Sequence, residues 1–220
     1  MKTTADAILR PEQAHYLEAI EPARDPLLAD LESFARERRQ PISDPEVASF
    51  LAVTTRASGA RSIVEVGTNI GYGAIVLARA AGPDARVVTI ENDASLVEVA
   101  RGNITRAGLA GQVEVRHADA LAELATLGPG IDLAYIDCVK EHYPAYLDLI
   151  LPKLSPRGIL IADNVLWRGL VAAPPEAELP AHEVGRVQAL RTFNHSIVSD
   201  SRLRGVILPL GDGVAYAVRV

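Results

Sequence analysis

SIVEVGTNIGYG, residues 62–73, carries the strongest signal for the architecture of this chain. It joins a run rich in β-branched residues, 62–66, to a glycine-rich turn and then to an apolar helical segment. A strand, a glycine turn and a helix in this order are typical of a doubly wound α/β sheet, in which a ligand lies against the helix N-terminus. We therefore expect a ligand site at the carboxyl end of this strand.

The spacing of the glycines limits the kind of ligand. Dinucleotide sites use the tight turn G-x-G-x-x-G, whereas this chain has the wider Gly67-x-x-x-Gly71. Glu65 at the strand end would repel an anion and attract a sulfonium or amino group. The alternative is a turn that is merely permissive, because glycine adopts backbone conformations that other residues avoid.

Further strands are expected downstream. Short runs at 86–90, 112–116, 131–136 and 158–162 alternate with helical segments, which predicts a parallel sheet with helices on both faces. The C-terminal runs GVILPL and GVAYAVRV flank Gly211-Asp212-Gly213, which predicts an antiparallel pair joined by a tight Asp-Gly turn at the sheet edge.

We expect one domain over residues 1–220, with N-terminal helices at 1–58 and an α/β core at 59–220. Ser43 to Glu46 is typical of a capped helix start. The segment from Gly169 to His182 is rich in Pro and Ala, which indicates an exposed loop.

Composition narrows the class of protein. The chain has 220 residues, 49% hydrophobic content and a formal net charge of -6, so the basic footprint of a protein that binds nucleic-acid phosphates is missing. The single cysteine, Cys138, cannot form an internal disulfide and has no identifiable His partner, so we interpret it as a packed residue. The N-terminus lacks a signal-peptide pattern, and no apolar run approaches about 18 residues. We expect a cytoplasmic protein without a membrane segment.

Two acidic positions extend the expected ligand site. Glu91 follows the second run 20 residues after Gly71, where a carboxylate can bind the two hydroxyls of a ribose. Asp119 and Ala120 follow the third run, where they can meet an adenine edge. The alternatives are a solvated loop carboxylate at Glu91 and a helix N-cap at Asp119.

Oxygen ligands follow the next two runs. Asp137 ends the fourth run, and Asp163 with Asn164 ends the fifth, so all three are expected at one edge of the sheet. Carboxylate and amide oxygens suit Mg²⁺, Mn²⁺ or Ca²⁺. Lys140 lies three residues after Asp137, and an ammonium group close to a divalent cation has a reason to lose its proton, which would make Lys140 a candidate general base. Taken singly, these residues are also consistent with helix-start carboxylates and a surface lysine.

In this order, the motifs resemble the cation-dependent class I S-adenosylmethionine (SAM)-dependent O-methyltransferases, the group of the catechol and caffeoyl-CoA O-methyltransferases and their small bacterial relatives. The similarity runs from about Pro41 to the C-terminus and rests on these pieces: Pro41-Ile42-Ser43, Glu65-Val-Gly-Thr-x-x-Gly-Tyr, Glu91, Asp119-Ala120, Ile136-Asp137-x-x-Lys140-x-x-Tyr143, Ala162-Asp163-Asn164-Val-Leu-Trp167, Arg191-x-Phe-Asn194 and Leu208-Pro-Leu-Gly-Asp212-Gly213.

The resemblance implies a Rossmann-like, doubly wound sheet of seven strands, with the last strand antiparallel and helices on both faces. It implies a homodimer that binds SAM through Ile42, Glu65, Gly67, Thr68, Gly71, Gly73, Glu91, Asp119, Ala120 and Asp137. It also implies a divalent cation, first of all Mg²⁺, on Asp137, Asp163 and Asn164, with Lys140 as the catalytic base. The expected reaction is methyl transfer to a hydroxyl of a small, catechol-like aromatic acceptor.

Two departures from the family pattern leave the acceptor open. Many bacterial members have Asp-Ala-Asp-Lys where this chain has Asp137-Cys-Val-Lys140, and Tyr-Ser where it has Tyr72-Gly73. Trp167 is a candidate for the wall against the acceptor ring, with a core or interface role as the alternative.

Three other functions remain as alternatives. An NAD-dependent oxidoreductase would share the sheet but not the glycine spacing. A tRNA hydroxyuridine methyltransferase of the same family could use the run Arg36-Glu-Arg38-Arg39 on phosphates, although this run is also typical of a solvated helix face. A non-enzymatic SAM-binding protein would not need Lys140 and the three metal ligands.

Overall fold

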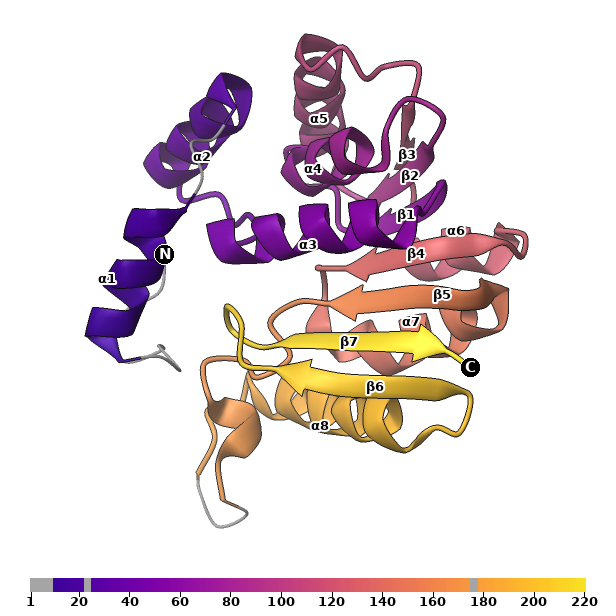
Figure 1. Cartoon of the computed structure of the whole chain (residues 1–220). Coiled ribbons are helices and arrows are strands. Elements are labelled where there is room, and N and C mark those ends of the chain that lie inside the picture. Colours follow the sequence, from indigo (N-terminus) through magenta and orange to yellow (C-terminus); the bar gives the residue numbers. More distant parts are fainter. Residues whose placement is uncertain (1–9, 22–24, 175–177) are drawn as a thin grey trace.

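The computed structural model describes residues 10–21, 25–174 and 178–220. They include seven strands, which form one sheet with the order β3-β2-β1-β4-β5-β7-β6 (Figure 1). The first five strands are parallel, and β7 is antiparallel to both β5 and β6. The strands are β1 (Ser62–Val66), β2 (Arg86–Glu91), β3 (Val113–His117), β4 (Ile131–Ile136), β5 (Leu154–Ala162), β6 (Leu203–Leu208) and β7 (Val214–Arg219). The expected doubly wound sheet with an antiparallel last strand is confirmed.

Helices cover both faces of the sheet (Figure 1). One face packs against α3 (Pro45–Ser58), α4 (Tyr72–Ala81) and α5 (Ala94–Arg106). The other packs against α6 (Ala120–Thr126), α7 (Tyr143–Ile150) and α8 (Val184–Ser199). Two helices precede them, α1 (Pro11–Ile20) and α2 (Pro26–Arg38), and short 3-10 turns span 140–142, 151–153 and 170–172.

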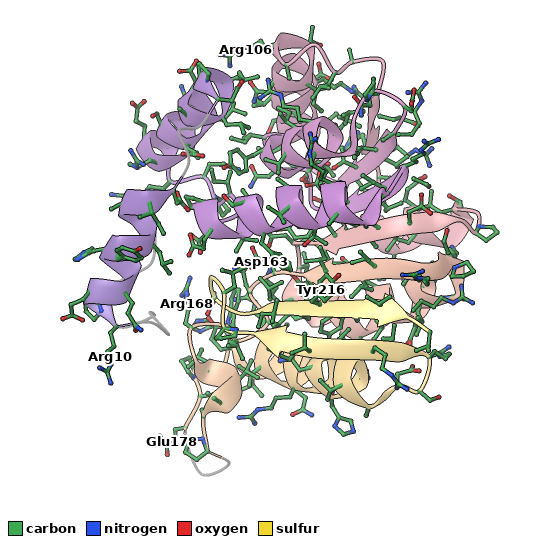
Figure 2. The ribbon with its side chains drawn as sticks, in the orientation of Figure 1. Arg10, Arg106, Asp163, Arg168, Glu178 and Tyr216 are labelled. Atoms are coloured by element: carbon green, nitrogen blue, oxygen red, sulfur yellow. The ribbon has the colours of Figure 1, made fainter. Side chains whose placement is uncertain are left out.

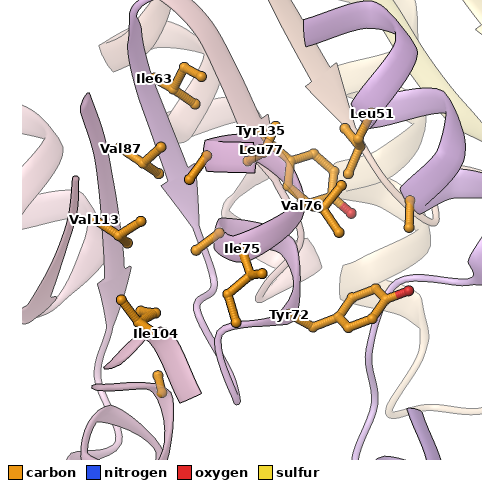
Figure 3. Close-up of a cluster of buried hydrophobic side chains, with 14 of the residues drawn as sticks. Leu51, Ile63, Tyr72, Ile75, Val76, Leu77, Val87, Ile104, Val113 and Tyr135 are labelled. Atoms are coloured by element: carbon orange, nitrogen blue, oxygen red, sulfur yellow. The ribbon is translucent and has the colours of Figure 1, made fainter. Parts of the chain in front are cut away.

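Alternation along β1 decides where Glu65 points. Ile63 packs into the core beneath α3 and α4 (Figure 3), whereas Val64 and Val66 face α6 to α8. Glu65 therefore shares the face of Ile63, because successive side chains of a strand point to opposite faces. The strand register sets Thr89 of β2 and Tyr135 of β4 beside it.

Three local expectations differ from the structure in detail. The connection from β6 to β7 spans residues 209–213 and does contain a tight turn, in which Gly213 N donates to Leu210 O at 2.8 Å, but its central residues are Gly211 and Asp212 and not Asp212 and Gly213. Glu91 is the last residue of β2 and does not follow the strand. Helix α3 begins at the expected place, but its N-cap Asp44 makes no side-chain cap, and the Ser43 hydroxyl bonds Tyr135 instead.

Parts of the sequence lie outside the described residues. These are residues 1–9, which include most of the stretch without a signal-peptide pattern, and residues 175–177 of the expected loop after Gly169. Within the described ranges, no helix has the length and apolar content needed to cross a bilayer.

Two glycines should respond in opposite ways to the same substitution. A Cβ on Gly205 of β6 would overlap the backbone carbonyl of Ile197 in α8, whereas a Cβ on Gly102 of α5 would meet open space. We expect Gly205→Ala to lower the free energy of unfolding by about 1–3 kcal/mol through overpacking. Gly102→Ala should raise it by about 0.5–1 kcal/mol because alanine favours helix. Urea denaturation measures both, and a neutral Gly205→Ala would contradict the close packing of β6 on α8.

Candidate active site

The carboxyl ends of the five parallel strands meet at one edge of the sheet. Backbone hydrogen bonds continue the ladder there: Asp137 N donates to Val66 O at 2.9 Å, and Asp163 N donates to Ile136 O at 2.9 Å. A cavity of about 640 Å³ opens over this edge. The predicted site residues that line it are Ile42, Glu65, Gly67, Thr68, Gly73, Glu91, Asp119, Ala120, Asp137, Lys140, Asn164 and Trp167.

Two predicted site residues do not line the cavity. Gly71 has φ 87° and turns the chain into α4, with the missing Cβ facing Ala100 of α5. Asp163 is 1% exposed and lies beneath the cavity. A second cavity of about 650 Å³ lies along β2, β3 and α5, and none of the predicted site residues lines it.

Gly67 brings the first turn close to Asp137. It has φ 101°, and a Cβ at this position would overlap the backbone carbonyl of Asp137. Only glycine combines this conformation with this approach. The glycine spacing in the sequence thus reflects contact between two strand ends.

Glu65 is buried under the cavity floor. Its Oε2 accepts a 2.5 Å hydrogen bond from the Thr89 hydroxyl, and Thr89 Oγ1 lies 2.6 Å from Thr68 Oγ1. Its Oε1 occupies the space that a Cβ of residue 73 would fill, so Gly73 makes room for the carboxylate. Burial raises the pKa of Glu65 to about 8, and the negative charges of Asp137 and Glu91 act in the same direction.

Glu91 binds the backbone on both sides of the cavity. Its Oε2 accepts from Asn69 N at 2.9 Å, and its Oε1 accepts from the backbone N–H groups of Asn92 and Asp93. Asn69 in turn donates from Nδ2 to Pro41 O at 2.6 Å. Glu91 therefore connects β2 to the glycine turn, and Asn69 connects that turn to the segment before α3. The ligand role of Glu91 stays a prediction.

Asp119 is the N-cap of α6 and accepts from Ala122 N at 2.9 Å, so the helix-cap alternative is confirmed for its side chain. Asp119 and Ala120 nevertheless line the cavity. Because the side chain is committed to the helix, the backbone of this pair is the part left to meet a ligand.

Lys140 is the buried cation of the site. It is 5% exposed, and its Nζ donates to Asp137 Oδ1 at 2.9 Å and to the Tyr143 hydroxyl at 2.7 Å. The Tyr143 hydroxyl donates to the backbone carbonyl of Asp163 at 3.0 Å. Burial raises the pKa of Tyr143 well above its ordinary value, so the phenol remains a donor. The surface-lysine alternative is wrong.

Asp163 is held in place from two sides. Its Oδ1 accepts from Asn164 N at 2.7 Å, and its Oδ2 accepts from the Tyr135 hydroxyl at 3.3 Å. Tyr135 also shares a 2.8 Å hydrogen bond with Ser43 before α3. Burial, and then the negative charge of Asp137, raises the pKa of Asp163 to about 8.

The oxygen-bearing side chains at this edge of the sheet decide whether a metal ion could bind here. In the described part of the chain, no three His, Cys, Asp or Glu side chains come together to form one. The predicted set has two carboxylates and one amide, Asp137, Asp163 and Asn164, all of them hard oxygen donors. Burial first, and then the negative charge of Asp137, raises the pKa of Asp163, while Lys140 acts in the opposite direction. The residues present thus fit a divalent cation chemically.

Several residues of the site were not predicted from the sequence. Glu183 is one of them, and its Oε2 accepts a 2.6 Å hydrogen bond from Nε1 of the predicted residue Trp167. Arg168 and Arg186 are two more, and they line the cavity beside the indole. Ser43 and Tyr135 also line it. Burial raises the pKa of Cys138 to about 12, which agrees with a packed thiol and not a nucleophile.

The family model described as O-methyltransferase matches residues 20–220. This chain belongs to the O-methyltransferase family. The membership agrees with the resemblance drawn from the motifs and argues against an NAD-dependent oxidoreductase.

Curated relatives and solved structures of this O-methyltransferase family agree with each other. The catechol O-methyltransferase of Niastella koreensis is 34% identical over 204 residues, 88% of this chain and 90% of that protein. The O-methyltransferase from Bacillus cereus in complex with SAH has a TM-score of 0.82 at 30% identity and covers 95% of this chain and 97% of its own. TomG from Streptomyces achromogenes in complex with SAM has a TM-score of 0.80 at 27% identity, over 96% and 100%.

Protonation of Glu65 should couple stability to pH. Its folded pKa of about 8 exceeds its ordinary value of 4.5, so the folded state binds the proton more tightly. This contribution is fully present below the unfolded pKa and is lost as pH rises towards 8. The charged and titratable groups that face Glu65 are Asp137, Glu91 and Tyr135.

We therefore expect wild type to lose more free energy of unfolding than Glu65→Gln between pH 5.5 and pH 8, without ligand. Urea denaturation at both pH values measures the two losses. Subtracting the loss of Glu65→Gln from that of wild type removes the contribution of the other titrating groups. Equal losses in the two proteins would contradict the burial of a protonated Glu65.

Proposed function

We propose that this chain transfers the methyl group of SAM to a hydroxyl of a small, catechol-like aromatic acceptor with the help of a divalent cation. The observation that carries the proposal is the buried Lys140, bonded to Asp137 at the wall of a cavity that also contains Glu65 and Glu91. The catechol O-methyltransferase of Niastella koreensis and the SAH and SAM complexes of its structural neighbours support this assignment.

We assign the nucleoside part and the methionine part of SAM to different residues that line the cavity. Glu91 accepts hydrogen bonds from the ribose hydroxyls, and the backbone at Asp119 and Ala120 meets the adenine. Glu65, Gly67, Thr68 and Gly73 surround the methionine part, with Ile42 and Asp137 at its sides. A sulfonium and an amino group bound beside Glu65 would favour its ionised form, so cofactor binding and loss of the Glu65 proton would support each other.

The chemistry then depends on positioning. Bound SAM would supply an electrophilic methyl group, and a divalent cation held by Asp137, Asp163 and Asn164 would lower the pKa of the acceptor hydroxyl. As the free amine, Lys140 would accept the hydroxyl proton at Nζ and become an ammonium group, and Tyr143 holds that nitrogen in place through a 2.7 Å hydrogen bond. Trp167 forms the wall against the acceptor ring. The Tyr135 hydroxyl, which is itself hydrogen-bonded to Ser43, orients the Asp163 carboxyl group. Mg²⁺ is the first choice of ion, with Mn²⁺ or Ca²⁺ as alternatives.

Other expectations stay untested: a homodimer, a cytoplasmic location, and tRNA as the alternative acceptor. The basic run from Arg36 to Arg39 lies at the end of α2, where Arg38 packs over the Phe34 ring at 4.8 Å. Because no feature of this run points to RNA and the chain is acidic, the small aromatic acceptor is preferred.

Gly73 provides a test of the cofactor assignment. Alanine at this position would displace the flexible end of Glu65 while leaving the backbone in place. We expect Gly73→Ala to weaken SAM binding at least about tenfold, as for the loss of a hydrogen bond to a charged group. Calorimetry measures the affinity, with Gly102→Ala as a helix control that keeps the wild-type value. Unchanged binding by Gly73→Ala would remove Glu65 from the cofactor site.

The cation and the base are tested by initial rates against added Mg²⁺. We expect chelator to abolish activity reversibly, and Asp163→Asn to lose most of it while the exposed control Asp148→Asn keeps it. Lys140→Met should bind SAM but turn over about 10²–10⁴-fold more slowly. Full wild-type activity in excess chelator would contradict the metal mechanism, and full activity of Lys140→Met would remove the base.

A further inference from the structure

Trp167 is surrounded by positive charge. Three cationic groups lie over its ring: Lys140 at 5.9 Å, Arg168 at 5.5 Å and Arg186 at 5.5 Å from the centroid. The protein as a whole is acidic, so this concentration of cations on one cavity wall is local. An acceptor ring packed against Trp167 would therefore also meet basic side chains.

The three cations differ in how much of their charge is already offset. Lys140 pairs with Asp137 at 2.9 Å. Arg186 pairs with Glu141 at 3.0 Å and with Glu183 at 3.4 Å. The hydrogen bond from Trp167 and then the charge of Arg186 lower the pKa of Glu183, so this carboxylate stays ionised. Both cations are therefore neutralised within the protein.

Arg168 is different. Among the described residues, the ion pairs of this wall involve Lys140, His182 and Arg186, and none of them involves Arg168. It is exposed and lines the cavity. Figure 2 shows Arg168 and Asp163 at the same end of the sheet, where β5 terminates. A cation in this place is available to a ligand.

The backbone of Arg168 is fixed in advance. Its N–H lies 2.8 Å and 2.9 Å from the two carboxylate oxygens of Asp212, and it has a left-handed φ of 54°. Leu166 N also donates to Asp212 O at 3.0 Å, and Gly213 has no Cβ that would collide with Leu166. The β6–β7 loop thus fixes the backbone around Trp167 and Arg168, which lowers the conformational entropy lost when a ligand binds there.

From this arrangement we propose that Arg168 binds one carboxylate on the acceptor, so that the site takes an aromatic acid with vicinal hydroxyls in preference to a neutral catechol. The inference rests on the proposed function and specifies its substrate class. The ring lies on Trp167 with its hydroxyls near Lys140, and the carboxylate meets Arg168 at the cavity mouth. A guanidinium and a carboxylate form paired, charge-assisted hydrogen bonds.

The surrounding charges favour a single carboxylate over a polyphosphate. Glu141 and Glu183 belong to the same wall and would repel additional negative charge. One unpaired arginine balances one carboxylate. A thioester carrying a nucleotide phosphate group would bring several negative charges close to Glu141 and Glu183.

The experiment compares two acceptors that differ only in charge, caffeate and methyl caffeate, with SAM and Mg²⁺. We expect wild type to favour caffeate in kcat/KM by about tenfold or more, as for a hydrogen bond between charged groups. Arg168→Gln should bring the ratio to about one. Arg168→Glu should invert it, and should favour the cationic catechol dopamine over caffeate.

Matched controls separate binding from a structural role. Arg157→Gln, an exposed arginine of β5 that does not line the cavity, should keep the wild-type ratio. Calorimetry with ferulate and methyl ferulate on the SAH complex should give the same selectivity and the same loss in Arg168→Gln, without turnover.

Equal wild-type rates for the acid and the ester, or a preference that survives in Arg168→Gln, would overturn the carboxylate contact while the proposed function stands. A preference for caffeoyl-CoA over caffeate would overturn it as well. Failure to methylate caffeate, methyl caffeate and catechol alike would overturn both the contact and the proposed acceptor class.

Discussion

The burial of several carboxyl groups at the carboxyl edge of the sheet is the constraint on which the rest of the site depends. Parallel pairing makes β1, β4 and β5 end side by side, so Glu65, Asp137 and Asp163 converge within one low-dielectric region. Among the described residues, the one buried cation there is Lys140. Burying carboxylates costs free energy unless a cation or hydrogen bonds offset it, and the raised pKa values of Glu65 and Asp163 express that cost. A sulfonium cofactor and a divalent ion are ligands whose charge would relieve it.

Local sequence signals were sufficient for the sheet and for the positions of its acids. Runs of β-branched residues predicted five parallel strands, and the chain order of a doubly wound fold predicted that Glu65, Asp137 and Asp163 end adjacent strands. Their finer roles depend on packing that no local pattern encodes. Asp163 is buried and does not line the cavity, and its Oδ2 accepts a hydrogen bond from the Tyr135 hydroxyl. Gly71 serves the turn into α4, whereas Gly73 makes room for Glu65, although both belong to the same glycine-rich stretch.

The residues that sequence reasoning missed depend on contacts between distant segments. Ser43 and Tyr135 are 92 residues apart, and Arg168 and Asp212 are 44 residues apart. Arg168 and Arg186 reach the same indole from the loop after β5 and from α8. Such groups have no spacing rule. Ion pairing distinguishes the two arginines, because Arg186 forms salt bridges with Glu141 and Glu183, whereas none of the ion pairs among the described residues involves Arg168. The departures from the family pattern at Gly73 and Cys138-Val139 lie around the same cavity, which is consistent with a site adapted to its own acceptor.

The proposed cation site is tested most directly by crystals grown with Mn²⁺ and S-adenosylhomocysteine, with anomalous diffraction recorded at the manganese edge. One anomalous peak within coordination distance of Asp137, Asp163 and Asn164, beside the bound cofactor, is the predicted result. Crystals that contain the cofactor but show no such peak, or a peak away from these three side chains, would contradict a divalent cation as the group that relieves the negative charge of the carboxyl edge.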